Sequence, residues 1–403
     1  DFRYLILFSI MIYYESFNDY KCYMQSKISV LQVIPQLDVS GASQGCIDVA
    51  NYLINNNHSC VVMTHAGKRL EDARNKGIEV IISPVHSKNP ITIFSNIFRL
   101  LRVIKEKEIN IIHVRSRAPA WSCFFASKFS GKKFVSTFHG TYNFNNFVKK
   151  FYNSIMLRTD GTIAISKFIE NQIKQKYSIR PNYLKVIYRG IDTNIFNSDN
   201  VNLHRIKQLK KQYCLEPDSI KILLPGRITG WKGHSILIQA IAEVIKNLQT
   251  KIEVLFVGPD DNIGLIKRLK DQILDLNMAS TFHFLGSSNE MENIYALSDI
   301  VISSSTDPEA FGRISIESQA MGKFVIASNH GGSKETIIND KTGYLYPPTD
   351  YKELSKMIIK AITENKYTSE EVSEFSKNNI RENYSLEQMC EETLKFYKII
   401  LGF

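Results

Sequence analysis

Residues 303–332 read SSSTDPEAFGRISIESQAMGKFVIASNHGG, and this stretch decides how the chain is interpreted. An apolar strand is expected to end at its start, an Asp-Pro turn follows, and a helix is expected to begin near residues 311–313. Glu309 then lies in the turn and Glu317 on the helix. Carboxylates in these places can accept hydrogen bonds from sugar or ribose hydroxyls, while N–H groups at a helix start can meet an anion. A single Glu is more often a solvated surface residue, so the rest of the chain has to support this interpretation.

Short runs of β-branched and apolar residues alternate with segments of helical period on both sides of this stretch. The pattern predicts strands at 28–34, 60–65, 78–82, 109–114, 133–137, 161–165, 184–188, 220–225, 252–257, 281–285, 299–303, 323–327 and 343–346. Helices are expected between them, among others at 44–57, 92–107, 119–129, 166–177, 234–248, 263–276 and 313–321. Such alternation is typical of parallel βα units, whose ligands bind beyond the carboxyl ends of the strands.

A length of 403 residues favours two domains over one core. We therefore expect an α/β protein with two tandem Rossmann-like domains that face a cleft. The expected divisions are 1–23, an upstream extension or non-native segment; 24–195, an N-terminal Rossmann-like domain; 196–219, a polar linker; 220–380, a C-terminal Rossmann-like domain; and 381–403, a C-terminal helix that packs back on the first domain.

Glu309 and Glu317, which flank a Phe-Gly pair and precede a strand, resemble the two-glutamate signature of retaining glycosyltransferase family 4, the glycosyl transferases group 1, which have the GT-B fold. Further landmarks occur in the order typical of this family. They are Ser40-Gly41 through Gly45, His139-Gly140, Ile165-Ser166, Arg189 to Asp192, and Gly226-Arg227 followed by Lys232-Gly233. Each motif is common, whereas their joint order is specific.

The resemblance implies that residues 24–195 form the acceptor-side domain and residues 220–380 the nucleotide-sugar-binding domain. It also implies a role for each matched residue of the second domain. Arg227 and Lys232 would hold the diphosphate, Glu309 the donor sugar and Glu317 the ribose, with the backbone N–H groups of Phe311, Gly312 and Arg313 nearby. The chemistry agrees, because cleavage of a glycosyl phosphate leaves extra negative charge that a bidentate Arg and a Lys can stabilise. For Arg227 and Lys232, an ordinary surface position is the alternative.

In the first domain, Gly41 would lie near the donor, although the family often has two adjacent glycines there and this chain has Ser-Gly-Ala. His139 would form a hydrogen bond near the transferred sugar, while a purely structural histidine is the alternative. The leaving phosphate can itself accept the acceptor proton in this kind of retaining transfer, and Glu309 is a nucleophile only on a double-displacement route. Gly331 and Gly332 could serve either backbone packing or a ligand.

The function expected is a retaining, metal-independent hexosyltransferase that moves a sugar from a nucleoside-diphosphate sugar to a hydroxyl acceptor, with no cofactor. No Asp-x-Asp follows an apolar strand, and the six cysteines show no metal-binding spacing. A nucleotide-sugar epimerase of the same fold and an inactive nucleotide-sugar-binding protein are the alternatives. A dehydrogenase is disfavoured because no Gly-x-Gly-x-x-Gly follows the first strand.

The net charge of +10 favours anionic partners, but the cations are too dispersed for nucleic acid. Residues 145–158 form a basic aromatic helix that could rest on an anionic membrane, or equally pack as an ordinary amphipathic helix. The resemblance makes a lipid-linked or lipopolysaccharide-type envelope glycan the expected acceptor. The expected location is the cytoplasm, peripheral to the inner face of the membrane, which agrees with dispersed cysteines typical of a reducing compartment.

Overall fold

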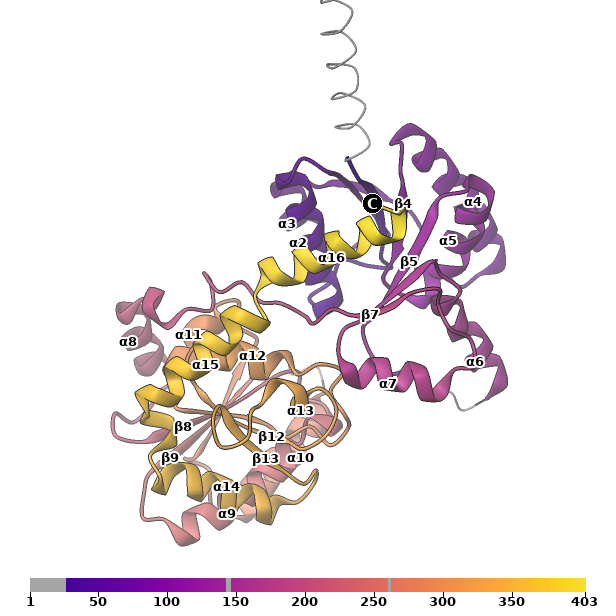
Figure 1. Ribbon diagram of the computed structural model, residues 1–403. Coiled ribbons are helices and arrows are strands. Elements are labelled where there is room, and N and C mark those ends of the chain that lie inside the picture. The colour runs from indigo at the N-terminus through magenta and orange to yellow at the C-terminus, as the bar shows by residue number, and fades with distance from the viewer. Residues whose placement is uncertain (1–26, 143–145, 260–261) are drawn as a thin grey trace, which may run out of the picture. The chain divides into compact units, whose positions relative to one another are not determined.

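The computed structural model describes residues 27–142, 146–259 and 262–403, and it consists of two compact units (Figure 1). Unit 1 comprises residues 27–164, 173–185 and 390–403 of the described chain, and unit 2 comprises 165–172 and 186–389. The expectation for residues 1–23 lies outside the described residues. Residues 196–219, which we expected to form a linker, lie in unit 2, where Leu209 and Leu215 are buried in its core.

Unit 1 is built on a seven-stranded sheet in the order β3-β2-β1-β4-β5-β6-β7. Its strands are β1 (Ser29–Val33), β2 (Ser59–Thr64), β3 (Glu79–Ile82), β4 (Ile111–Val114), β5 (Lys133–Phe138), β6 (Gly161–Ala164) and β7 (Leu184–Val186). Each pairing among β1 to β6 is parallel. The helices are α2 (Gly41–Asn55), α3 (Leu70–Asn75), α4 (Pro90–Glu106), α5 (Arg117–Ser130), α6 (Phe147–Ser154) and α7 (Lys167–Lys176), of which α7 contributes to both units.

Unit 2 has a six-stranded parallel sheet in the order β10-β9-β8-β11-β12-β13. Its strands are β8 (Ile220–Pro225), β9 (Ile252–Val257), β10 (Phe282–Gly286), β11 (Ile300–Ser303), β12 (Phe324–Ser328) and β13 (Gly343–Tyr346). Its helices are α8 (Leu203–Gln212), α9 (His234–Asn247), α10 (Ile263–Asp275), α11 (Met291–Leu297), α12 (Arg313–Ala320), α13 (Ser333–Thr336), α14 (Tyr351–Thr363) and α15 (Glu370–Asn383). Both predicted sheets are confirmed, with each of the thirteen expected strands present to within two residues at either end.

Local sequence explains why these helices begin where they do. In α4, the side chain of Asn89 accepts a hydrogen bond from the N–H of Ile91, and Pro90 occupies the first turn, where a missing N–H costs nothing. In α2, Ser40 caps the helix by accepting from the N–H of Ser43. The central strands β8 and β11 are buried along their whole length, as expected where helices cover both faces of a parallel sheet.

The last helix, α16 (Leu386–Leu401), begins in unit 2, and its residues from Cys390 onward belong to unit 1. Its side chains enter the core of unit 1, where a Cβ on Gly161 would lie 2.6 Å from both Phe396 Cζ and Ile400 Cδ1. The hydroxyl of Tyr397 is 2.5 Å from His113 Nδ1. Unit 1 is therefore completed by the C-terminal end of the chain.

Candidate functional site

The loops at the carboxyl ends of β8 and β11 in unit 2 contain the predicted donor-site residues. Gly226 and Arg227 follow β8, and a turn of 3₁₀ helix ends at Lys232 just before α9. Gly233 has φ +74°, and a Cβ there would overlap the carbonyl oxygen of Ser304. The hydroxyl of Ser304 donates across the same contact to the carbonyl of Lys232, at 3.1 Å. The loop after β8 and the loop after β11 therefore pack directly against each other, and Lys232 lies close to the loop after β11.

Lys232 and Glu309 form a direct ion pair. Lys232 Nζ lies 2.5 Å from Glu309 Oε1, and the side chains are only 13% and 15% exposed. The same carboxylate oxygen accepts from the hydroxyl of Ser305 at 2.7 Å, and the ammonium lies 4.5 Å from the centre of the Trp231 ring. The sequence predicted both residues for the donor site but assigned them to different parts of the ligand. Their direct pairing was not predicted.

Glu317 is held from two sides on α12. Arg313 Nε donates to its Oε1 at 2.6 Å, and the hydroxyl of Tyr295 donates to its Oε2 at 2.9 Å. The pKa of Tyr295 is raised well above its usual value, first by burial and then by the negative charge of Glu317. Tyr295 therefore stays a hydrogen-bond donor. It was missed in the sequence because it comes from α11, and only the fold brings it to the carboxylate.

Phe311 and Gly312 shape the start of α12. The side chain of Phe311 is buried against the rings of Tyr188 and Tyr384, whose centres lie 6.0 and 5.9 Å away. Gly312 has φ +91° and forms the N-cap of the helix, whose first residue is Arg313, as predicted. Because the side chain of Phe311 is buried, this residue can offer a ligand only its backbone N–H.

Gly331 and Gly332 are explained by packing. A Cβ on Gly331 would overlap backbone atoms of Glu309, and a Cβ on Gly332 would overlap backbone atoms of Phe311. The N–H of Gly332 also donates to the carbonyl of Glu309 at 2.8 Å. The neighbouring His330, which the sequence did not single out, is bonded through Nε2 to the carbonyl of Ser305 at 2.9 Å. These residues support the loop that carries Glu309.

The two site residues predicted in the first domain lie at the carboxyl ends of strands in unit 1. Gly41 begins α2 in the turn that follows β1, and a Cβ there would meet nothing within 4 Å. His139 directly follows β5.

On the adjacent strand β4, His113 is fully buried between Tyr397 and Thr137, and burial lowers its pKa well below the usual value. His113 is therefore neutral near pH 7.

Within residues 27–142, 146–259 and 262–403, no group of three or more His, Cys, Asp or Glu side chains could hold a metal ion. No helix in the same ranges is both long and apolar enough to cross a bilayer.

Two α/β units in one chain, each built on its own sheet with helices between the strands, are the architecture of the GT-B class, and solved structures agree. The crystal structure of a glycosyltransferase from Rickettsia africae superposes with a TM-score of 0.86 and 34% identity, covering 93% of this chain and 99% of that one. Anabaena HepE in complex with UDP-glucose shares the fold, with a TM-score of 0.79, 21% identity, and coverage of 92% and 99%.

The family follows from the sequence matches. Residues 39–195 match Glycosyltransferase Family 4, and residues 205–382 match Glycosyl transferases group 1. The chain therefore belongs to the glycosyltransferase family 4, group 1 proteins of GT-B fold. Among curated relatives, the lipopolysaccharide 1,2-N-acetylglucosaminetransferase of Salmonella typhimurium is 28% identical over 184 residues, or 43% of this chain and 48% of that enzyme.

Proposed function

We propose that this protein is a retaining, metal-independent glycosyltransferase that moves a sugar from a nucleoside-diphosphate sugar to a hydroxyl of a lipid-linked or lipopolysaccharide-type envelope glycan. Membership of the family supports the transferase activity. The Salmonella relative acts on lipopolysaccharide, which supports this class of acceptor. The Anabaena structure holds UDP-glucose, so UDP-sugars are the first donors to test.

The observation that carries the proposal is the ion pair of Lys232 and Glu309 in the loops at the carboxyl edge of the six-stranded sheet, with Glu317 on α12, the helix that follows the same loop. When the bond from the anomeric carbon to the phosphate breaks, negative charge develops on the phosphate oxygens. Lys232 and Arg227 would stabilise that charge, helped by the N–H groups at the start of α12. Glu309 would accept from hydroxyls of the sugar and Glu317 from the ribose diol.

The ion pair has a consequence for donor binding. Before the donor arrives, Glu309 neutralises Lys232 at 2.5 Å. A diphosphate that binds Lys232 has to compete with this carboxylate, while the sugar hydroxyls offer Glu309 new partners. When the donor binds, Lys232 therefore exchanges Glu309 for the diphosphate, and Glu309 exchanges Lys232 for the sugar hydroxyls. The intact sugar nucleotide should for this reason bind more tightly than the nucleotide or the sugar alone.

The acceptor side would be supplied by unit 1. Gly41 would let the backbone approach the donor, and His139 would hydrogen-bond near the transferred sugar. No base is assigned, because the leaving phosphate oxygen can take the proton of the attacking hydroxyl on the same face. A double displacement with Glu309 as nucleophile is the alternative route. Peripheral binding at the inner face of the cytoplasmic membrane would bring the enzyme to a lipid-linked acceptor.

The test is a thermal-shift screen of nucleotide sugars, followed by a transfer assay with the stabilising donor. Retention predicts that NMR of the product shows the same anomeric configuration as the donor. EDTA should leave the rate unchanged. Inversion, or activity lost in EDTA and restored by Mg²⁺, would overturn the mechanism. Conversion of the donor without transfer would support the epimerase instead, and binding without turnover would support the inactive binder.

A further inference from the structure

The positive charge of the chain is concentrated in one part of unit 1. Residues 84–158 contain thirteen Lys and Arg residues but only two acidic residues, Glu106 and Glu108. The whole chain has a net charge of +10, so the remaining residues together are almost neutral. This segment forms α4, α5 and α6, together with β4 and β5. A basic surface this localised attracts an anionic partner to one face of the unit.

The same three helices expose large apolar side chains. On α4, the exposed stripe is Ile91, Phe94 and Phe98, and Arg102 and Lys105 continue it toward the end of the helix. Phe125 and Phe129 are exposed on α5. Phe147, Val148 and Phe151 are exposed on α6, with Phe147 at 81%. Apolar side chains in this number on neighbouring helices mark an interaction surface.

Contacts within unit 1 make this one continuous surface. Phe94 packs edge-on against Phe98 on α4, and the hydroxyl of Ser122 on α5 donates to the α4 carbonyl of Ile93. The rings of Phe125 and Phe129 stack on α5. Trp121, also on α5, packs against Phe151 of α6 with ring centres 5.6 Å apart. We call this apolar and basic face the α4–α6 surface.

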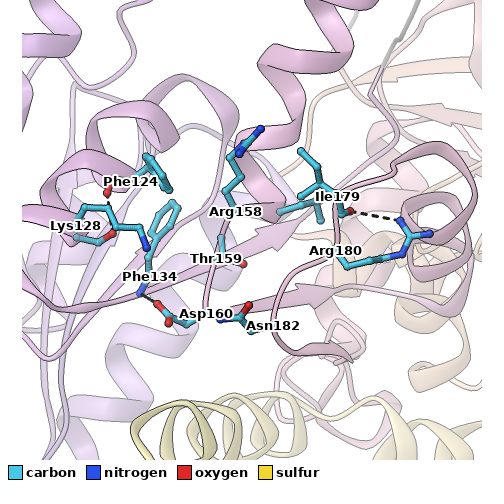
Figure 2. A pocket seen from close by; sticks show the side chains of 11 residues that line it. Phe124, Lys128, Phe134, Arg158, Thr159, Asp160, Ile179, Arg180 and Asn182 are labelled. Carbon is cyan, nitrogen blue, oxygen red and sulfur yellow. Dashed lines mark hydrogen bonds between the residues drawn. The ribbon is translucent and has the colours of Figure 1, made fainter.

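A pocket of about 230 Å³ adjoins the α4–α6 surface at the starts of β5, β6 and β7 (Figure 2). Lys128 of α5, Arg158 and Asp160 line it. Asp160 lies 3.9 Å from Lys133 and accepts from the N–H of Phe134, whereas neither Lys128 nor Arg158 forms an ion pair with a described residue. The Arg158 guanidinium lies 6.0 Å from the ring of Phe151, and the Lys128 ammonium lies 5.7 Å from the ring of Phe124. Arg180 also lines the pocket, but its guanidinium donates to backbone carbonyls at the end of α7. Lys128 and Arg158 are thus the cations available to an anion.

We propose that the α4–α6 surface docks unit 1 on an anionic phospholipid bilayer, with the phenylalanines entering the interface and Lys128 and Arg158 binding headgroup phosphates. Charge complementarity favours this occupant, because basic and aromatic side chains are interspersed and acidic ones are nearly absent. This inference rests on the proposed function, because membrane docking would give the enzyme access to a lipid-linked acceptor. Helices α4 and α6 begin at the edge of the sheet that carries Gly41 and His139, whereas the pocket with Lys128 and Arg158 lies at the opposite edge, so the α4–α6 surface extends between the two edges.

The two tryptophans of the chain provide a local test, because Trp121 borders the surface and Trp231 lies in unit 2. In the Trp231→Phe variant, vesicles with phosphatidylglycerol should shift Trp121 emission to the blue, and brominated lipid should quench it. In the Trp121→Phe variant, the same vesicles should leave Trp231 emission unchanged. Equal quenching of both tryptophans, or of neither, would overturn the proposal.

Substitutions then separate charge from apolar insertion in vesicle co-sedimentation. Lys128→Gln with Arg158→Gln should weaken binding to anionic vesicles about 30-fold, and high salt should do the same to the parent protein. Phe94→Ser with Phe98→Ser should weaken it about tenfold at any salt concentration. Matched controls in unit 2, Lys207→Gln with Lys211→Gln and Ile263→Ser with Leu274→Ser, remove exposed residues of the same kinds and should bind like the parent.

Other occupants would give different results. Self-association lost in Phe94→Ser with Phe98→Ser, with no vesicle binding, would make the surface a contact between copies and overturn the proposal. Binding to neutral and anionic vesicles alike would overturn the role of Lys128 and Arg158. Failure of this inference is distinguishable from failure of the proposed function, because donor binding by thermal shift needs no membrane. Donor bound without vesicles bound refutes the surface alone, and the reverse refutes the transferase alone.

Discussion

Lys232 and Glu309 lie 77 residues apart in the sequence and are joined by an ion pair of 2.5 Å. The pair exists because the loop after β8 and the loop after β11 interlock. The N–H of Thr306 donates to the carbonyl of Trp231 at 2.7 Å, and Gly233 fits against Ser304 only because it has no side chain. Lys232 is therefore neutralised by Glu309 in this structure, and under the proposed function the diphosphate of the donor would have to displace Glu309 from it.

Glu309→Gln should separate product binding from catalysis. Without the carboxylate, Lys232 is free to meet phosphate, so calorimetry should show UDP bound at least as tightly as by the parent protein. Transfer should fall about 100-fold, because the neutral amide oxygen of Gln accepts from the sugar hydroxyls more weakly than the carboxylate does. Lys232→Met should do the opposite to the nucleotide and weaken UDP binding about tenfold or more. Weaker UDP binding by Glu309→Gln would contradict the exchange of partners.

The bounds of the strands could be expected from the sequence to within two residues, because parallel strands are buried on both faces and show as continuous apolar runs, whereas the order of the strands in each sheet was not predicted. β8, with ILLP after Ile220-Lys221, is such a run. The helix start at Arg313 was also visible, since Gly312 supplies the positive φ of the cap. In both cases, local chemistry determined the local structure.

Side-chain partners across the fold could not be expected. Tyr295 reaches Glu317 from another helix, and Tyr397 reaches His113 from the far end of the chain. Such contacts depend on how elements pack, which a single sequence does not show. The same holds for residues 196–219, whose polar composition suggested a linker although Leu209 and Leu215 fill a core.

Tyr295→Phe should reveal how much Glu317 depends on its support. The change removes the hydroxyl that donates to Glu317 at 2.9 Å and keeps the ring in the core. We expect the dissociation constant of the donor to rise a few-fold, by about 1 kcal/mol. Glu317→Ala should weaken donor binding by about 1–3 kcal/mol, because it removes the acceptor itself. An unchanged dissociation constant for Glu317→Ala would exclude its proposed contact with ribose.

Three glycine substitutions distinguish a ligand role from a structural one. Gly233→Ala should cost about 3 kcal/mol or more, since it combines a strained φ of +74° with overlap on Ser304. Gly286→Ala, with φ +69° and open space around its Cβ, should show the strain alone, about 1 kcal/mol. A Cβ at Gly41 would meet open space, so Gly41→Ala should change the free energy of unfolding by no more than about 0.5 kcal/mol, whereas the rate of sugar transfer should fall. Full activity of Gly41→Ala would refute its place beside the donor.

His234 should make unit 2 sensitive to acid. It is buried against Phe256, with ring centres 4.9 Å apart, and burial, followed by the charge of Lys232, lowers its pKa to about 4. The folded unit thus binds the proton less well than the unfolded chain, whose histidine has a pKa near 6.5. The contribution of neutral His234 to the free energy of unfolding is complete above pH 6.5. It is lost as the pH falls toward 4, at up to about 1.4 kcal/mol per pH unit. Urea unfolding of the Trp121→Phe variant, followed through Trp231, should show this loss. The free energy of unfolding should differ between pH 6.5 and pH 4.5 by about 2 kcal/mol less when His234→Leu is added to this variant. An unchanged difference would contradict the role of His234.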